Sequence, residues 1–238
     1  METRVAEVAD QIYQFTTYVE DFNFSFNQYL IAADEPLLFH TGGKQLFPLV
    51  KDAVAKVLPP ETIQWISFGH VESDECGSMN EWLQVAPGAT VGVSATACMV
   101  SLNDLCIRPP MAWGGGGDGY DMGGHVMQWI DTPHVPHGWE AGVLYDATTK
   151  TLFCGDLFTQ TGSYAATSDS DIVEPAQAAE DMFHAWSLAP TSAAQIHSLA
   201  ALDIDRLALM HGPVFGGDCK AALLSLADDI AKRIAAAG

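Results

Sequence analysis

The sequence is poor in basic residues. It has ten lysines and arginines against thirty aspartates and glutamates among 238 residues, which gives a formal charge of −20. Such a surface repels the phosphate backbone of nucleic acid and the headgroups of anionic lipids. We therefore expect neither nucleic acid nor a membrane surface as a partner, and an acidic excess of this size also leaves room for bound cations.

Long apolar runs and regular cysteine spacings are missing as well. No run reaches the roughly 18 apolar residues that a membrane-spanning helix needs, and no signal-peptide pattern opens the chain. An odd, scattered set of cysteines without a CxxC pair indicates reduced thiols, so we expect a cytoplasmic protein. The five are Cys76, Cys98, Cys106, Cys154 and Cys219.

Apolar residues are plentiful, at 48% of the chain against 17% charged residues, which is a globular composition. Helix and strand patterns mix in both halves, and no linker separates them. We therefore expect one α/β domain over residues 1–238, built from two mixed β-sheets packed together and flanked by helices. Strand patterns cover residues 12–19, 24–32, 36–39, 63–68, 89–93, 125–131, 142–145, 151–154 and 207–210, and helix patterns cover 47–58, 80–85, 96–105, 173–186, 192–202 and 221–236.

A run of four glycines, Gly114–Gly117, is followed by Asp118 and Gly119. Glycine-rich loops can cradle phosphate, but that use needs a following Lys-Ser/Thr pair and the start of a helix. Neither is present, so the run predicts a turn or loop between strands.

Three ionisable residues at alternating positions follow the strand pattern at 63–68. In an extended segment, residues two apart point the same way, so His70, Glu72 and Asp74 can converge on one point. The preceding apolar strand would anchor them to the core, as a rigid metal site requires. Taken alone, the segment favours a solvated acidic loop over a metal site.

Three more apolar strand patterns end in candidate ligands. His134 follows the pattern at 125–131, Asp156 follows 151–154, and His211 follows 207–210. A histidine or a carboxylate flanked by apolar residues costs several kcal/mol to bury unpaired, so each needs a partner. A shared metal site would satisfy all of them at once. Imidazole and carboxylate donors without a thiolate suit iron or manganese, and zinc is a further alternative.

Four segments resemble the motifs of the metallo-β-lactamase superfamily: H-V-E-S-D at 70–74, T-P-H-V-P-H-G at 132–138, L-F-C-G-D at 152–156 and M-H-G-P at 210–213. The resemblance covers nearly the whole chain and implies the αββα sandwich of that superfamily. Its hydrolases have a second histidine where this chain has Glu72. The H-x-E-x-D version is that of the flavodiiron proteins, which hold two irons and reduce oxygen or nitric oxide.

The resemblance implies a role for each candidate. His70, Glu72 and His134 would bind the first iron, Asp74 and His211 the second, and Asp156 would bridge the two. The family has a histidine at position 75, so Glu75 is either a ligand of the second metal or leaves a place for water. Asp156 and His137 are our candidates for catalytic residues, with His137 and Trp139 lying around the ligands. The remaining histidines match no motif and are expected on the surface or in hydrogen bonds: His40, His125, His184 and His197.

The resemblance suggests a di-iron protein without its own flavodoxin domain, because the sequence leaves no room for one after His211. It would bind O₂ or NO and reduce it with electrons from a separate donor protein, or bind the gas without turnover, as a sensor does. The alternative is a metallo-hydrolase, in which a water between the metals attacks an ester, lactone, thioester or phosphoester. A homodimer is the default assembly.

Overall fold

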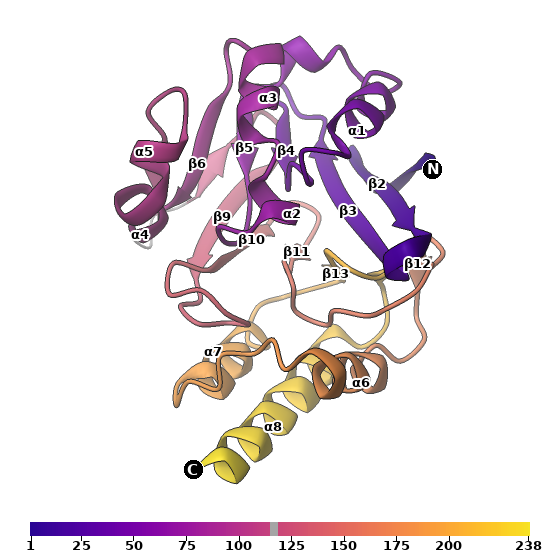
Figure 1. Cartoon of the computed structure of the whole chain (residues 1–238), viewed down its shortest axis with the longest axis vertical. Coiled ribbons are helices and arrows are strands. Elements are labelled where there is room, and N and C mark those ends of the chain that lie inside the picture. The colour runs from indigo at the N-terminus through magenta and orange to yellow at the C-terminus, as the bar shows by residue number, and fades with distance from the viewer. Residues whose placement is uncertain (115–118) are drawn as a thin grey trace.

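The computed structural model describes residues 1–114 and 119–238, and in this part of the chain two mixed β-sheets pack between two layers of helices (Figure 1). This is the αββα architecture expected from the sequence, and the prediction is confirmed. Most of the glycine run predicted to form a turn, residues 115–117, lies outside the described residues, together with Asp118.

The first sheet has the strand order β1-β2-β3-β4-β5-β6-β7. Its first three pairings are antiparallel, and those from β4 to β7 are parallel. Parallel neighbours end on the same side of a sheet, so residues that follow β4 and β5 come close together. The strands are β1 (Thr3–Ala9), β2 (Ile12–Val19), β3 (Phe24–Ile31), β4 (Leu37–Phe39), β5 (Trp65–Ser67), β6 (Thr90–Ser94) and β7 (Met111–Trp113).

The second sheet has the order β12-β14-β13-β11-β10-β9-β8. Here β11 and β13 run parallel as direct neighbours, and β10 runs antiparallel to both β9 and β11. The strands are β8 (Tyr120–Asp121), β9 (Val126–Asp131), β10 (Gly142–Asp146), β11 (Thr151–Phe153), β12 (Thr167–Ser168), β13 (Arg206–Ala208) and β14 (Val214–Phe215).

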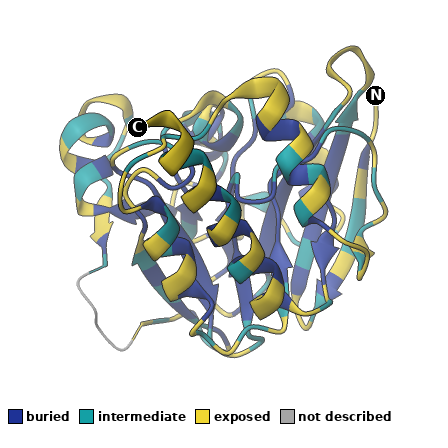
Figure 2. Cartoon of the chain, turned by 90° about the horizontal axis from the view of Figure 1, so that it is seen from below, coloured by how far each residue is buried: buried dark blue, intermediate teal, exposed yellow. Residues whose placement is uncertain are grey.

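Helices cover the outer faces, with α1 and α3 on the first sheet and α6, α7 and α8 beneath the second (Figure 1). Figure 2 shows exposed residues on the outward sides of the helices and buried residues in the strands beneath them. None of the described helices is both long and apolar enough to cross a lipid bilayer. The α-helices are α1 (Phe47–Val54), α2 (Ser73–Cys76), α3 (Met79–Val85), α4 (Ala95–Ala97), α5 (Asn103–Leu105), α6 (Val173–Phe183), α7 (Ser192–Leu199) and α8 (Cys219–Ala237).

Two apolar clusters hold these layers together. One lies between the two sheets and under α1 and α3, and the other lies between the second sheet and α6 to α8. Strand β1 was not predicted, because Arg4 and Glu7 interrupt its apolar residues. It lies at an edge of the sheet and pairs with β2 alone. The segments that follow β5, β9, β11 and β13 come together, and they carry the candidate site.

Candidate metal centre

The segment that leaves β5 and enters the first turn of α2 supplies three side chains to the site. His70 is almost fully buried, and Asp74 and Glu72 are partly exposed. Glu72 is in extended conformation as the residue before α2, so it still points with His70, whereas Asp74 lies in the first turn of the helix. The end of a buried strand and the start of a helix therefore fix all three residues.

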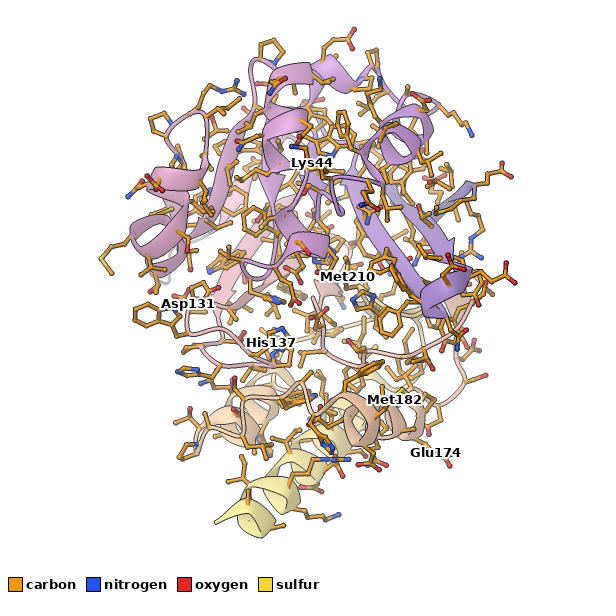
Figure 3. All side chains as sticks on the ribbon, in the orientation of Figure 1. Lys44, Asp131, His137, Glu174, Met182 and Met210 are labelled. Carbon is orange, nitrogen blue, oxygen red and sulfur yellow. The ribbon has the colours of Figure 1, made fainter. Side chains whose placement is uncertain are left out.

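The second sheet supplies three more side chains from three separate loops. His137 follows β9, Asp156 follows β11, and His211 follows β13. Figure 3 shows His137 in the region between the strands and helices α6 and α7. Because β11 and β13 are parallel neighbours, the residues just beyond their ends, Asp156 and His211, come to the same edge of the sheet.

Four residues form the first cluster: His70, Glu72, His137 and Asp156. The Nε2 atoms of His70 and His137 lie 2.9 Å apart, and Glu72 Oε2 lies 2.9 Å from the first and 3.0 Å from the second. Asp156 Oδ2 is 3.5 Å from His137 Nε2 and 3.7 Å from His70 Nε2. Two imidazole nitrogens and two carboxylate oxygens thus point at one small volume.

Three residues form the second cluster: Asp74, Asp156 and His211. His211 Nε2 lies 3.1 Å from Asp74 Oδ2 and 3.3 Å from Asp156 Oδ1. The His211 ring is fixed from behind, because Nδ1 lies 2.9 Å from the carbonyl oxygen of Ser25 and donates its proton there. Asp156 belongs to both clusters, with Oδ2 facing the first and Oδ1 facing the second.

This arrangement fits a pair of metal ions. Asp74 Oδ1 and Asp156 Oδ1 are buried without a hydrogen-bond partner, which is costly for carboxylate oxygens unless a cation binds them. A carboxylate with one oxygen in each cluster is the usual bridge of a two-metal site. Imidazole and carboxylate donors without a thiolate suit iron, manganese or zinc.

The structure corrects the position of one predicted ligand. His134 is exposed and belongs to neither cluster, whereas His137 contributes its Nε2 to the first one. His134 has a φ of +68°, and its amide donates to Gly138 O at 2.7 Å, which closes the loop and turns the side chain outward. Val135 and Pro136 are buried and hold the other half of the loop, so His137 points inward.

Of the two alternatives for Glu75, the structure favours the one in which it is not a ligand, because its carboxylate lies behind His70 and in neither cluster. Oε2 accepts a hydrogen bond from the His70 amide at 2.8 Å, and Oε1 lies 3.3 Å from His70 Nδ1 and 3.5 Å from His40 Nε2. Glu75 and His40 are both fully buried. Glu75 therefore holds the His70 ring so that Nε2 faces the site. His40 was not predicted there, although it directly follows β4, as the ligands follow their strands.

Two glycines make the space for this carboxylate. A Cβ atom at Gly69 would lie 3.1 Å from Glu75 Oε2, and one at Gly155 would lie 3.0 Å from Glu75 Oε1. Any side chain at either position would press on the carboxylate. Each glycine directly precedes a site residue, His70 or Asp156, so the two loops and the carboxylate pack as one unit.

The Glu75→Gln variant is expected to bind metal about 10- to 100-fold more weakly, the usual cost of removing a carboxylate behind a metal-binding histidine. The amide keeps the shape but loses the charge that orients the His70 ring. Zinc affinity in competition with a chelator measures the effect. Asp146→Asn is the matched control, because that buried carboxylate also pairs with a histidine, His125, and belongs to neither cluster. Equal affinities for wild type and both variants would contradict the role of Glu75.

In the metal-free protein, carboxylates raise the pKa of all three site histidines, and for His137 the cause is its hydrogen bond to Glu72. Burial opposes protonation of His211, but its close contacts with the carboxylates of Asp156 and Asp74 outweigh burial and raise its pKa to about 10. Burial also disfavours the charged form of His70, yet Glu75 and Glu72 raise its pKa well above 6.5. The hydrogen bond from His137, followed by that from His70, lowers the pKa of Glu72. His70 and His211 are therefore in the protonated, positively charged form at neutral pH.

Metal binding is expected to release at least about two protons per chain at pH 7, because protonated His70 and His211 must each lose one and His137, whose pKa is also raised, adds to the number. The number should fall, and the affinity for zinc should rise, as the pH approaches the pKa of His211 at about 10. In the metal-free fold, the His211 charge stabilises fully below pH 6.5, and this contribution is lost as the pH rises through about 10. Calorimetry of zinc binding in buffers of different ionisation enthalpy counts the protons. A binding heat independent of the buffer would contradict the expectation.

Cys76 lies beside the site but is not poised for redox chemistry. Burial, and then the charge of Glu75, raises the pKa of its thiol to about 12. A thiol in this state is a poor nucleophile and a poor ligand. The other four cysteines form no disulfide in the structure either.

A cavity of about 460 Å³ opens directly onto both clusters. Its floor is made by the site residues Glu72, Asp74, His137, Asp156 and His211. Among the described residues, its walls contain neither lysine nor arginine, and Glu180 is the one further charged residue. The wall residues are Phe22, Phe24, Pro136, Phe158, Thr159, Ala176, Ala179, Glu180, Phe183, Ala185 and Trp186.

The family described as "ODP family beta lactamase" matches residues 24–212, more than three quarters of the chain and all of the site. The chain belongs to the ODP beta-lactamase family. The sequence-based resemblance to the metallo-β-lactamase fold is thereby confirmed. Among curated proteins, this ODP-family chain is similar to "Diflavin flavoprotein A 1" of Synechocystis, with 25% identity over 197 residues. That match covers 80% of this chain and 34% of the relative, so the chain spans about a third of the relative's length.

Solved structures share the fold of this ODP-family chain. The metal-soaked Flv1 flavodiiron core from Synechocystis superimposes with a TM-score of 0.78 at 22% identity, covering 98% of this chain and 61% of that one. Rubredoxin oxygen:oxidoreductase from Desulfovibrio gigas gives 0.82 at 15% identity, covering 96% and 62%. A fragment of putative diflavin flavoprotein A 5 from Nostoc gives 0.78 at 16% identity and covers 99% of this chain and 98% of that one. The chain thus has the fold of a flavodiiron core.

Proposed function

We propose that this domain holds two iron ions and uses them to bind O₂ or NO and to reduce it. The first ion would be held by His70, Glu72, His137 and Asp156, and the second by Asp74, Asp156 and His211. The observation that carries the proposal is Asp156, whose two carboxylate oxygens face two separate clusters of donors.

The composition of the donor set supports iron. The two clusters together offer three imidazoles and three carboxylates and no thiolate, and hard oxygen donors with imidazole suit iron or manganese. Iron held by these residues would supply one-electron redox chemistry, which zinc lacks. The names of the relatives, diflavin flavoproteins and an oxygen oxidoreductase, point to the same chemistry.

The chain's own residues prepare the site for a small uncharged gas. The apolar walls, including Phe24 and Phe158, limit the water that can reach the donors. His211 is held by Ser25 and His70 by Glu75, so the Nε2 atoms of both rings face the donor clusters. We propose that electrons arrive from a redox group outside this domain, such as that of a donor protein, because the described residues offer no cysteine cluster that could carry them.

Elemental analysis and spectroscopy together test this function. Protein from iron-replete cells should contain about two irons per chain, as a two-metal site requires. After anaerobic reduction, the addition of oxygen or nitric oxide should produce a charge-transfer band in the near-ultraviolet or visible range. Oxygen consumption with a chemical reductant separates a reductase from a protein that only binds the gas. A protein that holds only zinc under these conditions and shows no band would overturn the proposal.

The alternative function is hydrolysis by a water held between the metals. The cavity walls carry no lysine or arginine to bind an anion, which disfavours phosphoesters and favours uncharged esters, lactones or thioesters. A screen of such substrates with the zinc-, manganese- and iron-loaded protein tests it. Turnover that disappears in Asp156→Asn, without any oxygen chemistry in the wild type, would select the hydrolase.

We further propose that residues 1–238 act as one domain and that the protein works in the cytoplasm as a homodimer. The free thiols support a reducing compartment, and two-fold dimers are the commonest assembly of soluble proteins. Light scattering in solution tests the assembly, and a mass equal to one chain would rule out the dimer.

A further inference from the structure

The cavity over the clusters is far larger than a diatomic gas. At about 460 Å³ it is ~15 times the roughly 30 Å³ share of one water molecule in the liquid. Its volume instead falls within the range of about 300–1,000 Å³ that is usual for sites that enclose an organic ligand. Gas binding therefore does not account for the size of this space.

Aromatic side chains from three separate segments line the cavity. Phe22 and Phe24 come from the segment before and into β3, Phe158 follows β11, and Phe183 and Trp186 come from the end of α6 and the loop beyond. The Phe24 ring meets the Phe183 ring edge to face, with centroids 5.7 Å apart and an angle of 76°. Such walls offer both ring faces and ring edges, the contacts that a flat aromatic molecule uses best.

The mouth of the cavity is also apolar. Phe22 is 71% exposed and Phe183 is 48% exposed, although both line the cavity. Large apolar side chains at the rim of a concave site usually mark a place where a ligand covers them. Since Phe183 lies at the end of α6 and contacts Phe24 in β3, the rim joins the two halves of the fold over the site.

The charges of the residues that line the cavity balance those of the metals once both ions are bound. Two divalent ions would bring four positive charges, and their ligands Glu72, Asp74 and Asp156 bring three negative charges. Glu180 adds one more negative charge, but its carboxylate accepts hydrogen bonds from two backbone amides and is 8% exposed. With no lysine or arginine in the walls, the loaded cavity is close to neutral and favours an uncharged ligand.

We propose that this cavity is the binding site of an uncharged aromatic small molecule, which sits between Phe24, Phe158, Phe183 and Trp186 and against the metal-binding face. The inference rests on the proposed metal pair only for the charge balance, and not on iron or on any reaction with oxygen. Its occupant would reach the floor of the cavity, so it is placed to act as a co-substrate of the same centre.

Calorimetry on the zinc-loaded full chain tests the proposal without redox chemistry, so its result is independent of whether the protein reacts with O₂. The probe is 2-naphthol, which is uncharged at neutral pH. We expect one molecule bound per chain with a dissociation constant on the order of ten micromolar. The anion 2-naphthoate, the cation 1-naphthylmethylammonium and the saturated alcohol 2-decalol are each expected to bind about tenfold more weakly or worse.

Two substitutions locate the probe. Phe183→Ala, at a partly exposed rim position, should weaken 2-naphthol binding about tenfold and leave the zinc affinity unchanged. Leu105→Ala is the control, since Leu105 is 51% exposed and is not part of the cavity. Binding of 2-naphthol that is absent, or insensitive to Phe183→Ala, would overturn the site. Tighter binding of the cation, the anion or the decalol would overturn the proposed ligand class.

Discussion

Asp156→Asn is expected to weaken the binding of both metal ions at least about 100-fold and to leave the purified protein nearly metal-free. The reason is that one residue serves both clusters. Oδ2 lies 3.5 Å from His137 Nε2, and Oδ1 lies 3.3 Å from His211 Nε2. Losing a group that only supports a ligand costs about 10- to 100-fold in affinity, so losing a shared ligand should cost at least the upper value for each ion. Asparagine keeps the shape and removes the charge.

Metal content and thermal stability both measure this effect. With zinc at about 100 times its dissociation constant, each bound ion adds ~2.7 kcal/mol to the stability of the wild type. For a chain of this length, that corresponds to a rise in Tm of about 5–10 °C per ion. The rise should vanish in Asp156→Asn. Asp52→Asn is the control, because that side chain is 76% exposed and far from any site residue in the sequence. Two tightly bound ions in Asp156→Asn would show that Asp156 is not the bridge.

Substituting the two histidines of one loop is expected to give opposite results. His137→Asn should weaken binding of the first ion about 100-fold or more, because the Nε2 of His137 lies 2.9 Å from that of His70 within the first cluster. His134→Asn should change the affinity less than about twofold, because His134 is exposed and outside both clusters. Asparagine also tolerates the positive φ of +68° at position 134, so the loop keeps its conformation.

Zinc titration of the two variants and the wild type under identical conditions decides between the histidines. The tight phase should disappear in His137→Asn and persist in His134→Asn. The reverse pattern would restore the assignment that the sequence motif suggests. A loss in both variants would mean that the loop itself, rather than one imidazole, holds the metal, and circular dichroism of the metal-free variants checks that each is folded.

Much of the fold could be predicted from apolar periodicity, because its central strands are buried on both sides. The patterns at 151–154 and 207–210 correspond to β11 and β13, two short buried strands of the second sheet. The two short strands at one end of the second sheet, β12 and β14, were harder to predict. Strand β12 spans only Thr167–Ser168 and β14 only Val214–Phe215, so neither is long enough to show a period. Their pairing depends on residues far away in the sequence.

The sequence by itself determined which chemistry gathers in this protein. Polar residues placed at the ends of apolar strands must share a partner, since each would be costly to bury alone, and this identified His70, Glu72, Asp74, Asp156 and His211. The carboxylate at position 72 also indicated the flavodiiron branch of the fold. These inferences are local, because strand ends and alternation are properties of a few consecutive residues.

Only the tertiary structure decided which of the remaining groups face the site. His134 and His137 are both next to a proline, and the loop's backbone hydrogen bond from His134 to Gly138 is what turns one outward and the other inward. Glu75 and His40 are 35 positions apart in the sequence, yet the parallel pairing of β4 with β5 brings them together behind His70. The direction of a side chain in a loop and the contents of the space behind a ligand depend on packing between distant segments, which no local pattern records.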